Sequence, residues 1–511
     1  MRSGLILAID QGTTNTKALL VDGSGFPVFR TSAAVPLRVL PNGFVEQDPR
    51  ALWESARNVS TQACTAAREF DAAVEAIAIS NQRETALAWN AETGQPVANA
   101  IGWQCGRAGA LCDRLARHSA MIRARTGLPL APLISAAKWA WMLENDPAVQ
   151  SAAQAGTLRF GTVDAWLVSQ STRGTVDSTD LTNASRTGLL NLHTLQWDHD
   201  LLDLFGIPAA AMPTLRTSAG SFGISSAIEE LEGVPILAAI GDSHAAMFGH
   251  GRYGPGSVKA TYGTGSSLMA LTSSLASDTP NLARTIAWSI AGTTQFALEG
   301  NIAMTGSAVQ WLGEFLRLPD PASDVAALAR TVPDAAGVYF VPAMMGLGAP
   351  HWDAQARGSV TGLGRSHTAA HLARAALDAI AYQVADVFFA MQDAARMQFA
   401  ELRADGGATR NEALMQFQSD ILGRPVLRSA NEELSALGAA WLAGLALGWW
   451  KTPDELEALP HGADRFAPVM DGLERDRLYA GWTRAVTGVR TTRPGSPTTG
   501  PSSLGLGKAM R

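Results

Sequence analysis

The stretch that decides the fold of this chain is Ile9-Asp10-Gln11-Gly12-Thr13-Thr14-Asn15-Thr16-Lys17. A carboxylate leaves a short apolar strand and enters a turn of glycine and hydroxyl residues, which a cation follows. Gly12 lets the backbone approach an anion closely, while Thr13 and Thr14 offer hydroxyl and amide donors. Lys17 adds positive charge, and Asp10 can hold Mg²⁺ or its waters. The stretch therefore predicts a phosphate-binding turn, for which an ordinary hairpin loop is the alternative.

The sequence around this first phosphate turn (residues 10–17) predicts a β-hairpin, because apolar runs at 5–9 and 18–21 flank it. A second glycine and hydroxyl hairpin is predicted over 258–269 and contains Thr264. A third element, 402–408, places two glycines after an apolar and polar strand, and a helix is expected from Asn411 onward. Two similar hairpins indicate a duplicated architecture whose turns could bind both ends of a nucleotide.

The length of the chain predicts two domains. A chain of 511 residues exceeds what one hydrophobic core usually supports, and 47% hydrophobic residues are enough to fill two. Glycine, proline and other breaker residues gather at 249–256, where we expect a hinge. We therefore expect an N-terminal domain over 1–250 and a C-terminal domain over 251–487. The composition after 488 turns to Thr, Pro, Gly and Ser, which predicts a flexible tail over 488–511.

Charge and cysteine usage exclude several classes of protein. A net charge of −6 argues against a nucleic-acid-binding surface. Three cysteines without paired spacing argue against a disulfide framework and indicate a reducing compartment. His367 and His371 lack the companions of a zinc site and are expected at a helix start or on the surface. Without a signal or transit peptide, the protein is expected to be cytoplasmic, and a homo-oligomer is left open.

The order of apolar runs along the chain predicts an α/β fold, because short strand-like runs alternate with longer helical stretches. The uncharged run 434–450 is just short of a membrane span and contains small residues, so we expect a buried helix and no membrane contact. A loop-rich region is expected over 172–186. The other expected helices are 52–70, 137–144 and 301–316, and the other expected strands are 74–80, 85–89 and 338–342.

Long motifs in this chain resemble the FGGY family of carbohydrate kinases, and within that family the glycerol kinases most of all. The resemblance covers nearly everything before the tail. It rests on collinear runs, which are Ser80-Asn81-Gln82-Arg83-Glu84-Thr85, Gly161-Thr162-Val163-Asp164-Ala165-Trp166-Leu167, Asp180-Leu181-Thr182-Asn183-Ala184-Ser185-Arg186-Thr187, Gly241-Asp242, Tyr262-Gly263-Thr264-Gly265, Ala349-Pro350-His351-Trp352-Asp353, Met415-Gln416-Phe417-Gln418-Ser419-Asp420 and Leu437-Gly438-Ala439-Ala440.

The resemblance implies two actin-like or hexokinase-like domains of the ribonuclease H-like class with a central interdomain cleft. It also implies ATP-dependent phosphorylation of a hydroxyl group with ATP and Mg²⁺ as cofactors. A GxxxxGK[ST] loop is absent from the sequence, which excludes the commonest other nucleotide fold. Asp242 follows an apolar strand and matches the family aspartate that takes the proton of the acceptor hydroxyl. The alternative for Asp242 is a helix N-cap, and both roles could coexist.

The resemblance also assigns residues to the nucleotide. Asp10 would coordinate Mg²⁺, and Thr13, Thr14, Lys17 and Thr264 would contact the phosphates. Lys17 stands where the glycerol kinases have an arginine, so its contact is expected to be looser because a bidentate fork is lost. Four further positions match residues that surround the nucleotide, and their alternative role is to form turns and helices. These positions are Gly306, Gln310, Gly407 and Asn411.

Arg83 and Glu84 match the pair that binds the acceptor: the guanidinium donates to substrate oxygens and the carboxylate accepts from hydroxyl groups. A surface ion pair on a turn is their alternative role. Trp103 would supply an apolar wall against carbon-bound hydrogens.

Three acceptor positions depart from the glycerol kinases. Leu133 stands in place of a tyrosine, Ser243 in place of a glutamine and Ser267 in place of a phenylalanine. These changes predict a larger and differently polar pocket, and therefore a polyol or ketose of four or five carbons. A divergent true glycerol kinase is the alternative. Two other classes are an ATP-dependent actin-like or chaperone-like binding protein, and a sugar sensor that lost activity.

Overall fold

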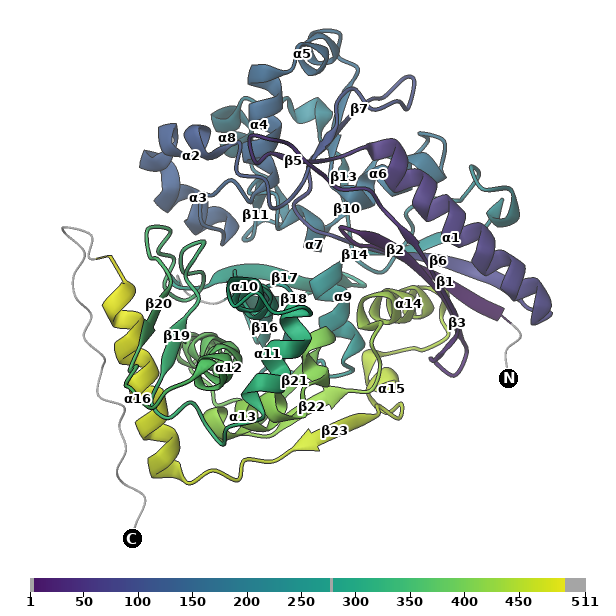
Figure 1. Ribbon diagram of the computed structural model, residues 1–511. Helices are drawn as coiled ribbons and strands as arrows, with labels where there is room; N and C mark the ends of the chain where they lie inside the picture. Colours follow the sequence, from purple (N-terminus) through teal and green to yellow (C-terminus); the bar gives the residue numbers. More distant parts are fainter. Residues whose placement is uncertain (1–3, 276–278, 492–511) are drawn as a thin grey trace.

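The computed structural model describes residues 4–275 and 279–491, and two mixed β-sheets form its centre (Figure 1). The first sheet has five strands in the order β14-β6-β1-β2-β3. Strand β2 runs antiparallel to both of its neighbours, β1 and β3, whereas β6 pairs parallel with β1 and β14 pairs parallel with β6. The strands are β1 Gly4–Gln11, β2 Asn15–Asp22, β3 Pro27–Ala34, β6 Ala73–Asn81 and β14 Ile236–Gly241.

The second sheet repeats this pattern and adds a strand at each edge, in the order β17-β18-β16-β15-β21-β22-β23. Here β16 runs antiparallel to both β18 and β15, whereas β21 pairs parallel with β15 and β22 pairs parallel with β21. The predicted duplication of the hairpin is therefore a duplication of the whole sheet. The strands are β15 Val258–Tyr262, β16 Ser266–Thr272, β17 Ala283–Ile290, β18 Thr293–Ile302, β21 Leu402–Asp405, β22 Val426–Ser429 and β23 Ala463–Phe466.

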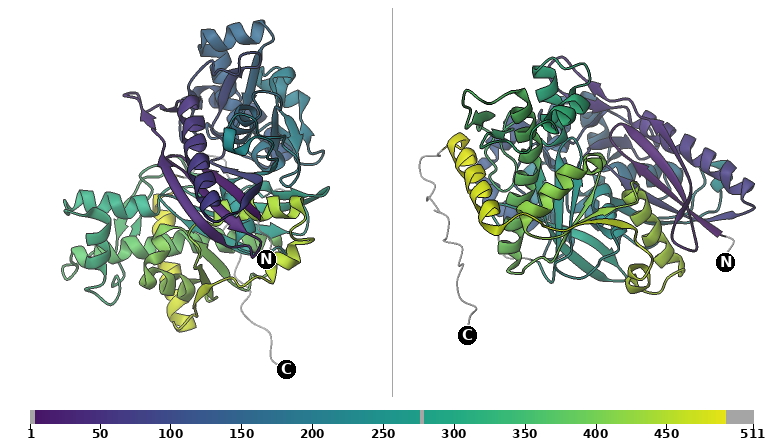
Figure 2. Two further views of the ribbon diagram at one scale, coloured as in Figure 1. Left: turned by 90° about the vertical axis from the view of Figure 1, so that its right-hand side faces the viewer. Right: turned by 60° about the horizontal axis from the view of Figure 1, so that its bottom comes forward.

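Both faces of β1 are buried, which explains its nearly continuous apolar sequence. Leu5, Leu7 and Ile9 pack on the side of α1 (Pro49–Glu69), whereas Ile6 and Ala8 pack on the opposite side. Helix α1 begins where Asp48 caps its first turn and Pro49 occupies the first helical position. Figure 2 shows α1 running along the outside of this sheet.

Two helices lie between the sheets. Helix α9 (Asp242–Gly249) follows β14 directly, and α14 (Leu434–Leu447) comes from the far end of the chain. Together they form one apolar core with residues of both sheets. The predicted buried helix at 434–450 is confirmed, and no helix of the described part of the chain is long and apolar enough to cross a membrane. On the other face of the second sheet lie α10, α12 and α13.

The remaining elements surround these layers, and α16 lies on the outer side of the second sheet, far from the first (Figures 1 and 2). The other strands are β4 Arg38–Val39, β5 Val45–Gln47, β7 Leu87–Asn90, β8 Ala100–Ile101, β9 Leu158–Gly161, β10 Ser178–Asp180, β11 Leu190–Asn191, β12 Gln196–Trp197, β13 Thr214–Arg216, β19 Tyr339–Val341 and β20 Ser359–Thr361. The other helices are α2 Gly109–Arg114, α3 Ser119–Thr126, α4 Ser135–Asn145, α5 Pro147–Gln154, α6 Val163–Ser171, α7 Leu181–Ala184, α8 His199–Phe205, α10 Gly306–Phe315, α11 Pro321–Ala329, α12 Ala369–Ala395, α13 Glu412–Leu422, α15 Pro453–Glu457 and α16 Gly472–Val489.

Several predicted boundaries are wrong. The helix expected over 301–316 begins only at Gly306, because Asn301 and Ile302 still pair with β16. The loop-rich region expected over 172–186 contains β10 and α7. The tail expected from 488 starts within α16, which ends at Val489, and residues 492–511 lie outside the described part. The division into domains at residue 250 stays a prediction, although 249–256 does connect α9 with β15.

Glycines allow α9 and α14 to approach each other closely. A Cβ atom at Gly438 would lie 1.9 Å from the carbonyl oxygen of Ala245, and one at Gly249 would lie 2.4 Å from that of Leu434. Side chains at these positions would push the helices apart, so glycine is required by the packing.

We predict that Gly438→Ala lowers the free energy of unfolding by about 1–3 kcal/mol, because the new methyl group collides with the backbone of α9. Urea unfolding followed by circular dichroism measures the change. The matched control is Gly488→Ala in α16, where a Cβ meets nothing within 4 Å and the change removes an exposed helical glycine. This control is expected to be neutral or stabilising by up to about 1 kcal/mol, and equal stabilities of the two variants would contradict the packing argument.

Candidate active site

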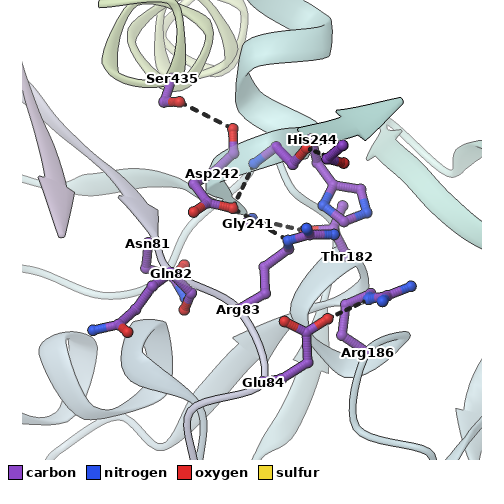
Figure 3. A network of polar contacts seen from close by, with 12 residues as sticks. Asn81, Gln82, Arg83, Glu84, Thr182, Arg186, Gly241, Asp242, His244 and Ser435 are labelled. Atoms are coloured by element: carbon purple, nitrogen blue, oxygen red, sulfur yellow. Dashed lines mark hydrogen bonds and ion pairs between the residues drawn. The ribbon is translucent and has the colours of Figure 1, made fainter. Parts of the chain in front are cut away.

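The carboxyl ends of three parallel strands bring the predicted acceptor residues together. In the first sheet, Asp10 at the end of β1 pairs with Ser80 of β6, and Gly241 at the end of β14 pairs with Asn81. Because neighbouring parallel strands end at the same edge, Arg83 and Asp242 follow β6 and β14 into the same region. Figure 3 shows Arg83 and Asp242 pointing toward each other.

Asp242 is the first residue of α9, and its side chain is 38% exposed. Its Oδ1 accepts hydrogen bonds from Arg83 Nε at 3.2 Å and from the Ser243 amide at 2.6 Å. Burial raises the pKa of Asp242, while Arg83 opposes that effect. The N-cap position of α9 belongs to Gly241, so the N-cap alternative for Asp242 is wrong.

The backbone before Asp242 is fixed by hydrogen bonds. The Gly241 amide donates to Thr182 Oγ1 at 2.9 Å, and the Thr182 hydroxyl donates to Asp180 at 2.8 Å. On the other side, Ser435 at the start of α14 donates its hydroxyl to the Asp242 carbonyl oxygen at 3.1 Å (Figure 3). These contacts hold the carboxylate at a defined position even though its oxygens are partly exposed.

Arg83 and Glu84 lie in a buried charge network, formed by Asp242, Arg83, Glu299, Arg186 and Glu84. Arg83 Nη1 donates to Glu299 Oε1 at 2.6 Å, and Arg186 Nε donates to Glu84 Oε1 at 2.6 Å. Glu299 Oε2 lies 2.6 Å from Arg186 Nη1. The alternative of a surface ion pair is wrong, because the side chains of Arg83 and Glu84 are only 10% and 5% exposed.

The sequence does not indicate that Glu299 and Arg186 belong to this network. Arg186 belongs to one of the family motifs, but nothing in the sequence indicates its partner. Glu299 interrupts a strand that is otherwise apolar at 296–298, and a carboxylate in such a strand is the signal that could have revealed it. Its two partners come from other elements, so their identity depends on the tertiary structure.

Two of the three acceptor positions that differ from the glycerol kinases lie together in the structure. Ser243 Oγ and Ser267 Oγ lie 3.2 Å apart, and Ser267 also donates to Glu299 at 3.3 Å. The fully buried Lys259 donates to Ser243 Oγ at 2.7 Å, and burial lowers the pKa of Lys259. Leu133 is separate from this pair, although its carbonyl oxygen accepts from Lys138, which also donates to the carbonyl oxygen of Glu84.

The first phosphate turn lies beside these residues. Ser80 Oγ donates to Asp10 Oδ1 at 2.8 Å, and Lys17 Nζ donates to Glu433 Oε2 at 2.6 Å. Trp103, which is 40% exposed, donates its indole N–H to Thr13 Oγ1 at 3.0 Å. The predicted wall residue and the predicted phosphate ligand are therefore in direct contact.

Thr14 is an exposed residue of this turn. Its hydroxyl accepts a hydrogen bond from Asn15 Nδ2 at 3.2 Å, and its carbonyl oxygen accepts from the Val35 amide at 2.7 Å. The hydroxyl of Thr14 is therefore tied only to a neighbouring side chain.

The second phosphate turn (residues 262–267) packs against the start of α10. The carbonyl oxygen of Thr264 accepts from the Thr305 amide at 3.1 Å and from the Ser307 amide at 3.0 Å, and the Gly306 amide donates to the Gly263 carbonyl at 3.1 Å. A Cβ at Gly306 would lie 2.7 Å from that carbonyl oxygen, so the glycine permits the close approach.

The other residues predicted to surround the nucleotide lie on neighbouring elements. Gly407 begins the 3₁₀ helix η4 (Gly407–Arg410) after β21, next to Gly406, where a Cβ would lie 2.5 Å from the carbonyl oxygen of Tyr262. Asn411 caps α13 by accepting from the Leu414 amide at 3.2 Å, and Gln310 donates to Glu314 at 2.8 Å on α10. Gly306 and Gly407 thus both flank the second phosphate turn.

The three cysteines are free and buried, and His371 joins Thr368 in a capping box at the start of α12. Within residues 4–275 and 279–491, no cluster of three or more His, Cys, Asp or Glu side chains could hold a metal ion by itself.

Comparisons with known proteins identify the family of this chain. The model of the FGGY family of carbohydrate kinases, N-terminal domain, matches residues 5–249, and the C-terminal domain model of the same family matches 258–447. A glycerol kinase of Burkholderia multivorans is 46% identical over 489 residues, which cover 95% of this chain and 98% of that protein.

Solved structures show the same fold. The crystal structure of Plasmodium falciparum glycerol kinase with ADP has a TM-score of 0.90 and 31% identity, and the match covers 96% of this chain and 99% of the other. The xylulose kinase from Rhodospirillum rubrum has a TM-score of 0.83 and 27% identity, with 95% and 98% covered. The predicted two-domain fold and family resemblance are confirmed, and the chain belongs to the FGGY family of carbohydrate kinases.

Proposed function

We propose that this protein transfers the γ-phosphoryl group of ATP to a hydroxyl group of a small polyol or ketose, with Asp242 as general base. The observation that carries the proposal is the partly exposed carboxylate of Asp242, held at a strand end between Arg83 and the first phosphate turn. Membership of a carbohydrate kinase family and similarity to a glycerol kinase solved with ADP support it.

Phosphoryl transfer depends mainly on positioning and on charge compensation. The acceptor oxygen forms a bond to the γ-phosphorus while the bond from phosphorus to the β–γ bridging oxygen breaks, which releases ADP with the electron pair. The hydroxyl proton passes to Asp242. The raised pKa of Asp242 suits this task, because a base must bind the proton to be effective.

We assign the nucleotide to the two phosphate turns. Thr13, Thr14 and Lys17 from the first turn and Thr264 from the second would contact the phosphates. Gly306, Gln310, Gly407 and Asn411 would surround the adenosine.

The residues of the first turn also fit Mg²⁺, which usually takes one or two carboxylates together with phosphates and waters. Burial raises the pKa of Asp10 to about 6, and Asp242 contributes in the same direction, so this carboxylate favours a cation beside it. Asp10 would hold the ion, which would compensate charge on the phosphates.

The acceptor pocket favours a substrate longer than glycerol. Arg83 and Glu84 would bind hydroxyl groups and Trp103 would cover carbon-bound hydrogens. The contact between Ser243 and Ser267 places two small hydroxyl side chains where the glycerol kinases have a glutamine and a phenylalanine. We therefore propose a polyol or ketose of four or five carbons, with a divergent glycerol kinase as the alternative. The cytoplasmic location and the oligomeric state stay predictions.

A binding protein of the actin or chaperone type would use the same nucleotide fold but has no need of an acceptor site. The buried charge network that holds Arg83 and Glu84 therefore speaks against it. ATP turnover that needs no added polyol would favour such a protein, whereas tight sugar binding without transfer would favour a sensor.

We predict that purified protein with MgATP phosphorylates an acceptor from a panel of glycerol, erythritol, pentitols, ribulose and xylulose, and that Asp242→Asn lowers kcat by about 10²–10⁴. Release of ADP measures the rate. A four- or five-carbon acceptor is expected to exceed glycerol in kcat/KM by at least about tenfold, or 1.4 kcal/mol. If glycerol is the best acceptor, the interpretation of Leu133, Ser243 and Ser267 is wrong.

We predict that Ser267→Phe combined with Ser243→Gln shifts the preference toward glycerol, because the larger side chains fill the space of the extra carbons. The ratio of kcat/KM for glycerol to that for the best longer acceptor is expected to rise about tenfold or more. Measuring both acceptors with the same preparation cancels differences in active fraction. An unchanged ratio would show that these positions do not set specificity.

We predict that Asp10→Asn raises the free energy of unfolding by about 1–3 kcal/mol at pH 7.5 without Mg²⁺. Because the pKa of about 6 in the folded protein lies above the usual 3.8, ionising Asp10 lowers stability as the pH rises from about 4 to 6, and the loss is complete above that range. Urea unfolding at pH 7.5 and pH 4 measures the effect, which should nearly vanish at pH 4. A variant less stable than wild type at pH 7.5 would contradict this reasoning.

A further inference from the structure

Glu299 is a fully buried carboxylate that comes from β18 in the second sheet, whereas the two arginines that it contacts belong to the region around the first. Its Oε1 accepts from Arg83 Nη1 at 2.6 Å, and its Oε2 lies 2.6 Å from Arg186 Nη1. Burial opposes ionisation, but Arg186 and Arg83 hold the pKa of Glu299 well below its usual range. Glu299 is therefore an anion shared by two guanidinium groups.

Each arginine in turn contacts a second carboxylate. Arg83 Nε donates to Asp242 at 3.2 Å, and Arg186 Nε donates to Glu84 at 2.6 Å. Figure 3 shows Arg83 directed at Asp242 and Arg186 at Glu84. The buried charge network thus alternates in sign along its whole length, with Glu299 at its centre. Burying so many charges is tolerable only when each one is paired.

These contacts leave one polar side-chain atom of Arg83 and one of Glu84 available to a substrate. Arg83 uses Nε for Asp242 and Nη1 for Glu299, and Glu84 uses Oε1 for Arg186. In the described part of the chain, neither Nη2 of Arg83 nor Oε2 of Glu84 has a hydrogen-bond partner. One donor and one acceptor remain for a substrate with hydroxyl groups, which both donate and accept. A free Arg83 side chain would instead have many rotamers.

We propose that Glu299 is a positioning residue of the acceptor site, which holds Arg83 directly and Glu84 through Arg186 so that these two side chains are preorganised for a polyhydroxyl substrate. Preorganisation spares the entropy of ordering long side chains when the substrate binds. Because Glu299 belongs to the second sheet, it also ties the acceptor site of the first sheet to the sheet that carries the second phosphate turn. This inference rests on the proposed function.

The test is a comparison of kinetic constants for Glu299→Gln, which keeps the shape and removes the charge. We expect KM for the acceptor to rise at least tenfold, while KM for MgATP changes less than twofold. Calorimetric titration of the acceptor should show the same loss of affinity. A purely structural role would lower the melting temperature or affect both substrates alike, so an unchanged KM for the acceptor or a parallel change in both constants would overturn the proposal.

A double-mutant cycle with Arg83→Met tests whether Glu299 acts through Arg83. If it does, Glu299→Gln should raise the acceptor KM by a smaller factor in the Arg83→Met background than in the wild type, because only the route through Arg186 and Glu84 remains. Equal factors in the two backgrounds would show that Glu299 does not act through Arg83 and would overturn that route. If Glu299→Gln does not fold, Glu299→Asp keeps the charge and withdraws the carboxylate by one methylene, and the same selective rise in acceptor KM is expected.

The matched control is Glu401→Gln, which removes another carboxylate paired with an arginine, Arg403, at 3.0 Å outside the site. Its kinetic constants are expected to equal those of the wild type. If the wild type phosphorylates no acceptor at all, the proposed function fails together with this inference. If the wild type is active and Glu299→Gln behaves like it, only the role of Glu299 is overturned.

Discussion

The contact between α9 and α14 holds the two sheets at a fixed separation, and the candidate site depends on that separation. Gly249 and Gly438 allow the backbones to touch, because a Cβ at either position would collide with the other helix. Each of the two helices carries a residue of the candidate site near its start. Asp242 begins α9, and Ser435 in the first turn of α14 donates its hydroxyl to the carbonyl oxygen of Asp242. Helix packing therefore also positions the proposed base.

The buried charge network depends in turn on this arrangement. Glu299 approaches Arg83 and Arg186 only because β18 of the second sheet lies next to the edge where β6 ends. An isolated charge at any of these positions would be strongly disfavoured in a buried environment. Alternation of carboxylates and guanidinium groups offsets much of that cost. It also gives the proposed acceptor site a defined geometry, which a kinase needs in order to align a hydroxyl group with a phosphorus atom.

The two phosphate turns occupy matching places in the duplicated sheets. Both turns connect antiparallel strands, β1 with β2 and β15 with β16. Lys17 is paired with Glu433 without ligand, so nucleotide phosphates would have to compete for its charge. Lysine is suited to such an exchange, because its ammonium group is a point charge on a flexible chain and needs no fixed planar geometry.

Local patterns in the sequence correctly predict the α/β class, both hairpins, the buried helix at 434–450 and the position of Asp242 after an apolar strand. These features depend on local patterns, namely apolar runs, glycines and the residues that follow a strand, and so they can be recognised along the chain. The same patterns failed at 301–316, where pairing with β16 extended a strand into residues with helical spacing.

The contacts between residues that are distant in sequence follow from the fold. The contact of Ser243 with Ser267, the pairing of Lys17 with Glu433 and the central place of Glu299 join segments that lie far apart in sequence. Local pattern carries no information about such partners, because they are selected by the packing of two sheets around α9 and α14. Motifs in the sequence thus predict phosphoryl transfer, whereas the geometry of the proposed acceptor site depends on how the two sheets pack.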